Sequence, residues 1–207
     1  MALEGAEPRV DADGGAIWPD RSDAGNDAQL LNAPAFDADG GSFVLDGVDD
    51  WISVPTSTSM QTPVSTMTVL LALEAPPTTD RVFLIQGYSN DTTSFTHYWY
   101  ENNSLVIFYG SYTGLAEIPW SALQTGWHEV TVTYDGATVT VYVDGKPFGN
   151  APVATTQVST LPLSIGADFN GGYRGPSKRI GAVLMYNRAL SAADVAYNSG
   201  ILKRRFR

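Results

Sequence analysis

Residues 41–55 constrain the fold of this chain more than any other stretch of the sequence. Apolar Phe43 and Leu45 alternate with smaller or more polar neighbours, a pattern typical of a half-buried strand. Asp46-Gly47 has the composition of a tight turn, and an extended pattern resumes at Trp51 until a proline ends it. The stretch therefore predicts a β-hairpin whose turn is acidic.

The composition favours one all-β domain. The chain has 207 residues, of which 43% are hydrophobic, enough to bury a sizeable core. Its 20 glycines and 12 prolines, together with many Thr, Val and Tyr, favour strands and turns over helices. The absence of cysteine excludes a disulfide framework and a thiolate metal site, so any structural metal must be a hard cation bound through oxygen.

Charge is distributed unevenly along the chain. Residues 1–50 hold twelve acidic and two basic side chains, whereas residues 174–207 hold eight basic and one acidic. The net charge of −10 argues against nucleic acid as the main partner, because phosphates would be repelled. The asymmetry predicts head-to-tail packing of copies, or docking of the basic end on an acidic neighbour; a merely solvated tail is the alternative.

The sequence carries no signal for membrane insertion or secretion. No apolar run approaches the roughly 20 residues of a membrane span. The acidic N-terminus also lacks the apolar core of a secretory signal. We therefore expect synthesis in the host cytoplasm without a signal peptide, and release by lysis or within a larger particle.

Residues 128–143 predict a second hairpin. If Asp135-Gly136 forms a two-residue loop, Val132 lies opposite Val139. The valines of both strands then share one face and the threonines the other. A slip of one residue would scatter the valines over both faces, so the alternation nearly fixes the register of the two strands.

Several blocks resemble the laminin-G-like, concanavalin A-like lectin/glucanase superfamily. The family patterns W-x-D-x-S-G-N-G-N-x-A, L-x-N-x-P-x-F and FDGxDDYV match residues 17–28, 30–36 and 45–52, in that order. The patterns GWHxVxxxYDGxxxxxYVDGxxxG, PLxIG and GxIxEVxxYNRALS match residues 126–149, 162–166 and 179–191, in that order. The resemblance implies an all-β, two-sheet antiparallel sandwich, a jelly roll with short helical turns and a short C-terminal helix. It covers residues 17–198, which leaves 1–16 as an acidic N-terminal arm and 199–207 as a basic C-terminal tail.

The acidic residues do not follow a glycosidase pattern. Retaining glycosidases hold two carboxyl groups about 5–5.5 Å apart, which on one strand face requires acids two residues apart. None of the six glutamates lies two residues from another carboxylate. His97 and His128 are isolated, and a packed structural role is expected for His128. We therefore predict that the protein is not an enzyme.

The resemblance implies a calcium site at the rim of the sandwich. Asp46, Asp49 and Asp50 are the expected ligands, with Asp168 and Asn170 as further contributors. The alternative is that these aspartates form the turn by accepting hydrogen bonds from nearby backbone N–H groups. Against calcium, the closing strand lacks the acidic residue common in the family.

Aromatic residues near predicted loops form a candidate carbohydrate site. The four selected are Trp99, Tyr100, Tyr112 and Tyr173. Because side chains alternate along a strand, part of such a set must point into the core. Packing in the core or against another subunit is therefore the alternative for each of them.

The C-terminal sequence suggests a docking segment. Ser191 and Asp194 have the spacing of a helix capping box. The residues expected to dock on an acidic, partly apolar partner are Ile201, Leu202, Lys203, Arg204, Arg205, Phe206 and Arg207. The ending resembles that of laminin-G-like proteins encoded by tailed bacteriophages.

These observations predict a non-enzymatic virion structural module. It would be a capsid decoration, fibre or tail-associated protein that docks through its termini on other virion proteins or on copies of itself. Binding of a host surface glycan is compatible with this role. The alternatives are a stand-alone carbohydrate-binding adhesion module and, last, a glycan-cleaving enzyme.

Overall fold

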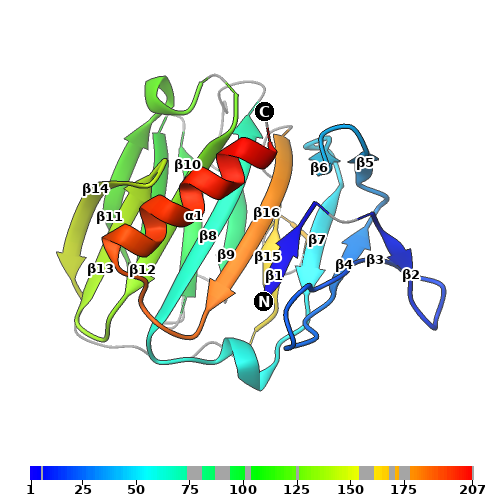
Figure 1. Cartoon of the computed structure of the whole chain (residues 1–207), viewed down its shortest axis with the longest axis horizontal. Coiled ribbons are helices and arrows are strands. Elements are labelled where there is room, and N and C mark those ends of the chain that lie inside the picture. The colour runs from blue at the N-terminus through cyan, green and yellow to red at the C-terminus, as the bar shows by residue number, and fades with distance from the viewer. Residues whose placement is uncertain are drawn as a thin grey trace.

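Two antiparallel sheets packed face to face account for most of the described residues in this computed structural model (Figure 1). The structure describes residues 1–5, 7–73, 81–86, 94–100, 104–124, 126–153, 161–167, 171–172 and 178–206. For residues 81–86, 94–100 and 109–115 the description is limited to the backbone.

Sheet A contains eight strands. In spatial order they are β14 (Lys146–Pro152), β13 (Thr138–Val143), β12 (His128–Tyr134), β8 (Ser65–Leu73), β16 (Lys178–Tyr186), β6 (Ser42–Leu45) and β5 (Ala35–Asp37), and β1 (Ala2–Glu4) pairs with β16.

Sheet B also contains eight strands. In spatial order they are β11 (Ser104–Pro119), β10 (Ser94–Tyr100), β9 (Arg81–Gln86), β15 (Leu163–Ile165), β7 (Trp51–Val54), β4 (Ala28–Leu31), β3 (Ala16–Trp18) and β2 (Arg9–Val10). The described pairings in both sheets are antiparallel, which confirms the predicted sandwich.

Among the described residues, three helical segments accompany the sheets: the 3-10 turns η1 (Thr58–Met60) and η2 (Trp120–Ala122), and the helix α1 (Ala192–Arg205). Figure 1 shows α1 lying across the outer face of sheet A. The predicted capping box is confirmed, since Ser191 Oγ accepts from the Asp194 N–H and the Asp194 carboxylate accepts from the Ser191 N–H. Among the described helices, none is long and apolar enough to cross a membrane.

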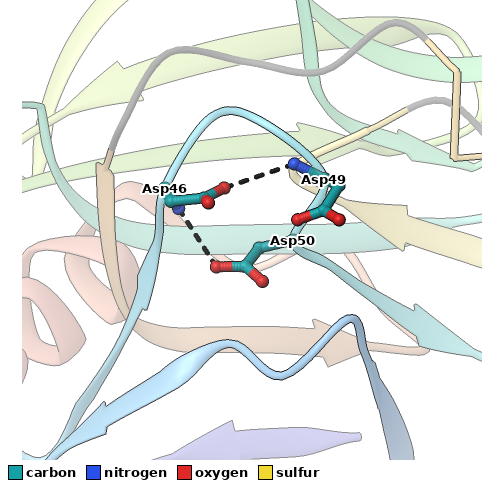
Figure 2. A group of neighbouring side chains, drawn as sticks. All are labelled: Asp46, Asp49 and Asp50. Atoms are coloured by element: carbon teal, nitrogen blue, oxygen red, sulfur yellow. Dashed lines mark hydrogen bonds between the residues drawn. The ribbon is translucent and has the colours of Figure 1, made fainter.

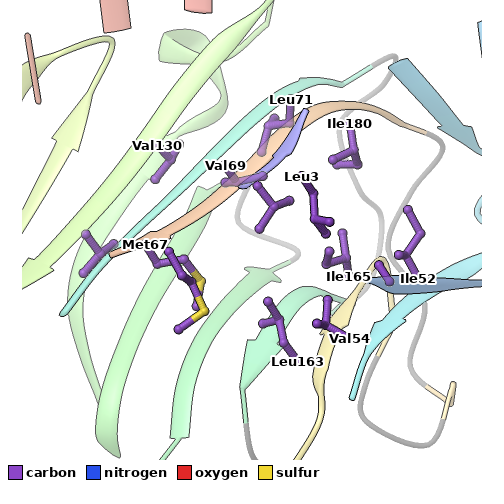
Figure 3. Packing of buried hydrophobic residues seen from close by; sticks show 14 of the residues in the cluster. Leu3, Ile52, Val54, Met67, Val69, Leu71, Val130, Leu163, Ile165 and Ile180 are labelled. Carbon is purple, nitrogen blue, oxygen red and sulfur yellow. The ribbon is translucent and has the colours of Figure 1, made fainter. Parts of the chain in front are cut away.

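The main core lies between the two sheets (Figure 3). Met67, Val69 and Leu71 alternate along β8 and are buried in this core. Leu70, on the opposite face of β8, is also fully buried, because it packs in a second cluster with residues of α1. The central strand of sheet A is therefore buried on both faces, as expected for a strand with a continuous apolar run.

The predicted hairpin at residues 41–55 is wrong, although both strands are present. β6 belongs to sheet A, where it pairs with β16 and β5, whereas β7 belongs to sheet B, where it pairs with β15 and β4. The acidic turn thus carries the chain from one sheet to the other. Leu45 of β6 and Ile52 of β7 are both fully buried in the core between the sheets.

The hairpin of β12 and β13 has the predicted faces but a register that differs by two residues. Val132 lies opposite Val141 and Tyr134 opposite Val139, so the loop contains four residues instead of two. Asp135 explains the wider loop: its Oδ1 accepts hydrogen bonds from the N–H groups of Ala137 at 2.9 Å and Thr138 at 2.8 Å. A shift of two residues leaves the faces unchanged, because side chains alternate with period two.

Both ends of the chain are part of the folded domain. Leu3 of β1 is fully buried and lies opposite Val183 of β16. At the other end, α1 extends to Arg205, and Phe206 is buried. Residues 1–5 of the expected acidic arm (1–16) and residues 199–206 of the expected basic tail (199–207) are therefore packed on the sandwich.

Candidate functional site

Three carboxylates meet in the loop that joins β6 to β7. One carboxylate oxygen from each of Asp46, Asp49 and Asp50 lies within 4.8 Å of the others. Asp46 and Asp49 are exposed, whereas Asp50 is buried at the base of the loop (Figure 2). This arrangement brings together all three residues that the sequence predicted as metal ligands.

The same aspartates also shape the loop. Asp46 Oδ1 accepts from the N–H groups of Val48 at 2.7 Å and Asp49 at 3.3 Å, and Asp50 Oδ2 accepts from the Asp46 N–H at 3.2 Å. The turn-forming interpretation is therefore confirmed for Asp46. It does not exclude cation binding, because an ionised carboxylate has about four lone-pair sites.

The electrostatics of the loop favour a cation. Burial raises the pKa of Asp50, and the negative charges of Asp46 and Asp49 raise it further, while the Asp46 N–H and the charge of Lys178 oppose them. A cation among the three carboxylates would relieve their mutual repulsion. Carboxylate oxygens are also the ligands that calcium prefers, so the donor set fits this ion.

Trp51 lies next to the acidic loop, and the predicted carbohydrate residues did not include it. Its side chain is partly exposed, and its indole packs on Gly171 so closely that a Cβ there would lie 2.9 Å from Trp51 Cε2. Gly171 also has a positive φ of 70°, which favours glycine. Trp51 follows Asp50 directly in the chain, so an aromatic residue begins β7 where the acidic loop ends. The signal in the sequence was Trp51 itself, at the aromatic position of the FDGxDDYV pattern.

The other predicted ligands cannot be placed against this loop. Asp168, Asn170 and Tyr173 lie outside the described residues. Trp99 and Tyr100 belong to β10 and Tyr112 to β11, but their side chains are outside the described part of the structure. The carbohydrate platform built on these aromatic residues therefore stays a prediction.

Four of the predicted docking residues contact the chain itself, and burial corrects the docking expectation for two of them, Leu202 and Phe206. Leu202 and Phe206 are buried, and the Phe206 ring packs against Trp127 with centroids 5.3 Å apart. Lys203 Nζ lies 2.9 Å from Asp144 Oδ1, and Arg205 Nη1 lies 3.1 Å from Glu4 Oε2. Of the remaining three, Ile201 and Arg204 are exposed and Arg207 lies outside the described residues.

A polar network lies under α1 that the sequence analysis did not anticipate. Glu129 of β12 is fully buried; one of its oxygens accepts from the Thr131 hydroxyl, and Oε2 has no hydrogen-bond partner among the described residues. Burial raises the pKa of Glu129; the Thr131 and Ser199 hydroxyls oppose this shift, and the charge of Asp144 adds to it.

Asp144 anchors α1 to the loop between β13 and β14. Its carboxylate lies 3.0 Å from His128 Nδ1 and accepts from the Glu129 N–H at 3.1 Å, in addition to its ion pair with Lys203. Burial would raise the pKa of Asp144, but hydrogen bonds from His128 and Lys203 hold it at about 2. His128 thus lies mostly buried beside Asp144, and the structural role expected of it stays a prediction.

Solved structures with this fold include binding domains and an enzyme. The botulinum neurotoxin serotype D binding domain has a TM-score of 0.74 at 11% identity, over 97% of this chain and 51% of that one. The binding domain of botulinum neurotoxin DC, in complex with rat synaptotagmin II, has a TM-score of 0.74 at 12% identity, with coverages of 98% and 51%.

A Trypanosoma rangeli sialidase in complex with the inhibitor DANA has a TM-score of 0.70 at 18% identity, over 96% of this chain and 32% of that one. At these identities the likeness shows the fold alone, and this chain spans about half the length of the toxin domains and about a third of the sialidase. No curated protein matches the sequence. The family model for the "Concanavalin A-like lectin/glucanases superfamily" matches residues 46–196, and the chain therefore belongs to this family.

Proposed function

We propose that this chain is a non-enzymatic binding module that recognises a surface glycan at the rim formed by the β6–β7 loop. The supporting observation is the set of three carboxylates within 4.8 Å of one another, followed directly in the chain by the partly exposed residue Trp51. Carboxylates accept hydrogen bonds from sugar hydroxyls, and an aromatic ring offers an apolar face to the sugar ring.

The hydrogen bonds of the loop support binding over catalysis. The distance between the carboxylates alone does not decide between binding and catalysis, because a retaining glycosidase needs two carboxyl groups about 5–5.5 Å apart. However, Asp46 and Asp50 both accept backbone N–H groups within the loop that connects the two sheets. We therefore assign them to loop structure and cation binding.

Calcium is the proposed ion, held by Asp46, Asp49 and Asp50. We expect chelator to lower the melting temperature and millimolar calcium to restore it, because a ligand that binds only the native state stabilises it. At a calcium concentration of 100 times Kd the stabilisation is about 2.7 kcal/mol. Differential scanning calorimetry with and without chelator measures the shift.

Asp49→Asn is the informative variant for calcium. Asp49 is exposed, and its carboxylate makes no hydrogen bond to the described residues, so the change spares the loop. The variant should lose the calcium response, while Asp23→Asn, an exposed acid elsewhere, should keep it. Identical melting curves with and without calcium in the unaltered protein would leave the three aspartates as turn residues only.

Glycan binding is tested with Trp51→Ala on a glycan array, with circular dichroism to check the fold. We expect loss of the bound glycans, while Tyr197→Ala, which removes an exposed aromatic ring from α1, should bind them like the unaltered protein. Array binding that survives Trp51→Ala would move the site away from this rim. Release of reducing sugar from a bound glycan would instead favour the enzyme alternative.

We further propose a virion as the setting of this module, with other virion proteins or copies of the chain as partners. The resemblance of the C-terminal sequence to phage-encoded laminin-G-like proteins supports this. Particles banded on a density gradient should carry the protein in a fixed ratio to the capsid protein. Protein that binds cells but never bands with particles would favour the stand-alone adhesion module.

A further inference from the structure

The outer face of α1 carries apolar side chains that nothing in the described structure covers. Tyr197 and Ile201 are 70% and 41% exposed, and their spacing of four residues places them on the same side of the helix. Arg204, one turn further on, is exposed and forms no ion pair with any residue that the structure describes. We call these three residues the α1 stripe. The opposite side of the helix is already buried against sheet A, so the stripe is not needed for folding.

The tip of the acidic loop (residues 46–50, between β6 and β7) has a composition complementary to that of the α1 stripe. Val48 is 70% exposed and lies between Asp46 and Asp49, which are exposed as well. The aliphatic side chain of Val48 between two carboxylates is therefore complementary to the α1 stripe, in which two apolar side chains lie beside the guanidinium of Arg204. The high exposure of both surfaces shows that neither is covered by the other within the same chain.

We propose that the α1 stripe docks on the acidic loop of a second copy of this chain. Ile201 and Tyr197 would cover Val48, and Arg204 would pair with Asp49, so that apolar side chains meet and the guanidinium faces a carboxylate. The two patches differ and lie on different parts of the chain; in the head-to-tail arrangement that we propose, each contact leaves one free patch at each end of a pair. Such contacts build rings or open chains.

The size of the patches sets the strength of the contact. A few side chains on each partner bury far less than the roughly 1,600 Å² of a standard interface. The association should therefore be weak and concentration-dependent in solution, and it becomes strong only where many copies are held together. The acidic loop is shared with the proposed calcium and glycan site, whereas the stripe contains no residue of that site. Sedimentation without glycan or calcium therefore tests this contact separately from the proposed function.

The test is sedimentation velocity of the full chain over a concentration series, in chelator so that the loop carries no calcium. Ile201→Asp and Val48→Asp each remove one of the two patches, and each variant alone should sediment as a monomer, with an apparent dissociation constant raised about tenfold or more. Mixing the two should restore association, limited to dimers, because one intact stripe and one intact loop remain. Val10→Asp alters an equally exposed valine outside both patches and should leave association unchanged.

Three results would overturn the proposal. The unaltered chain could remain monomeric at every concentration. Val48→Asp could associate like the unaltered chain while Ile201→Asp does not, which would indicate symmetric pairing of two helices. The mixture could fail to recover any dimer although both variants keep the melting temperature of the unaltered chain.

Discussion

Truncation after Gly200 should destabilise the whole domain. Leu202 and Phe206 are buried in a cluster with Leu70 of β8 and Leu184 of β16, so their removal uncovers the outer face of sheet A. Replacement of a large buried apolar side chain by alanine costs about 2–5 kcal/mol. The double change Leu202→Ala with Phe206→Ala therefore approaches the roughly 5–15 kcal/mol by which a domain is stable.

Urea denaturation followed by tryptophan fluorescence measures this effect. Ile201→Ala is the matched control, because it alters an exposed residue of the same turn and should change the free energy of unfolding by less than about 0.5 kcal/mol. An unfolding midpoint in the double variant equal to that of the control would mean that α1 is dispensable. The C-terminal segment would then regain the role of a docking tail.

The sequence predicts the burial of the C-terminal segment only in part. Val195, Ser199, Leu202 and Phe206 are spaced by four, three and four residues, the period of one helix face, and all four are buried. The pattern indicates that this face is covered, but a helix face covered by its own domain has the same pattern as one covered by a partner. Only the tertiary structure distinguishes the two.

Gly181 shows that the C-terminal segment is covered by its own domain. A Cβ at Gly181 would lie 2.7 Å from Phe206 Cε1, so the strand position must be glycine for the ring to pack there. Gly181 and Ala182 stand where the family commonly has an acidic residue. This departure from the pattern indicated a weaker metal site in the sequence, whereas in the structure it makes room for the C-terminal aromatic ring.

The local sequence also could not predict which sheet each strand beside the acidic loop would join. Phe43 and Leu45, the turn and Trp51 predict two strands correctly, but turn composition does not say whether the strands pair with each other or with distant ones. Long-range partners decide this, since β6 pairs with β16 and β7 with β15. The three aspartates were predictable as a group because they are close in sequence, whereas the passage of their loop from one sheet to the other was not.

Glu129→Gln should stabilise the protein at neutral pH, by about 1.4 kcal/mol for each tenfold increase in the proton affinity of this carboxyl group on folding. Glu129 is fully buried, and burial raises its pKa above the ordinary value. Glutamine has nearly the same shape as the neutral acid and keeps an oxygen for the Thr131 hydroxyl. It removes the cost of ionising the side chain under α1, and its N–H groups replace Oε2, which has no partner among the described residues and so limits the gain.

The pH dependence separates this explanation from a general improvement in packing. Because the folded state holds the Glu129 proton more tightly than the unfolded chain, stability is highest below the unfolded pKa and falls as pH rises through the folded pKa. The gain from Glu129→Gln should therefore vanish near pH 4 and grow toward neutral pH. Glu117→Gln, which alters an exposed glutamate, should show no gain at either pH. The measurement is urea denaturation of both variants from pH 4 to pH 8. An equal gain from Glu129→Gln at every pH would contradict a buried, ionisable carboxyl group under the helix.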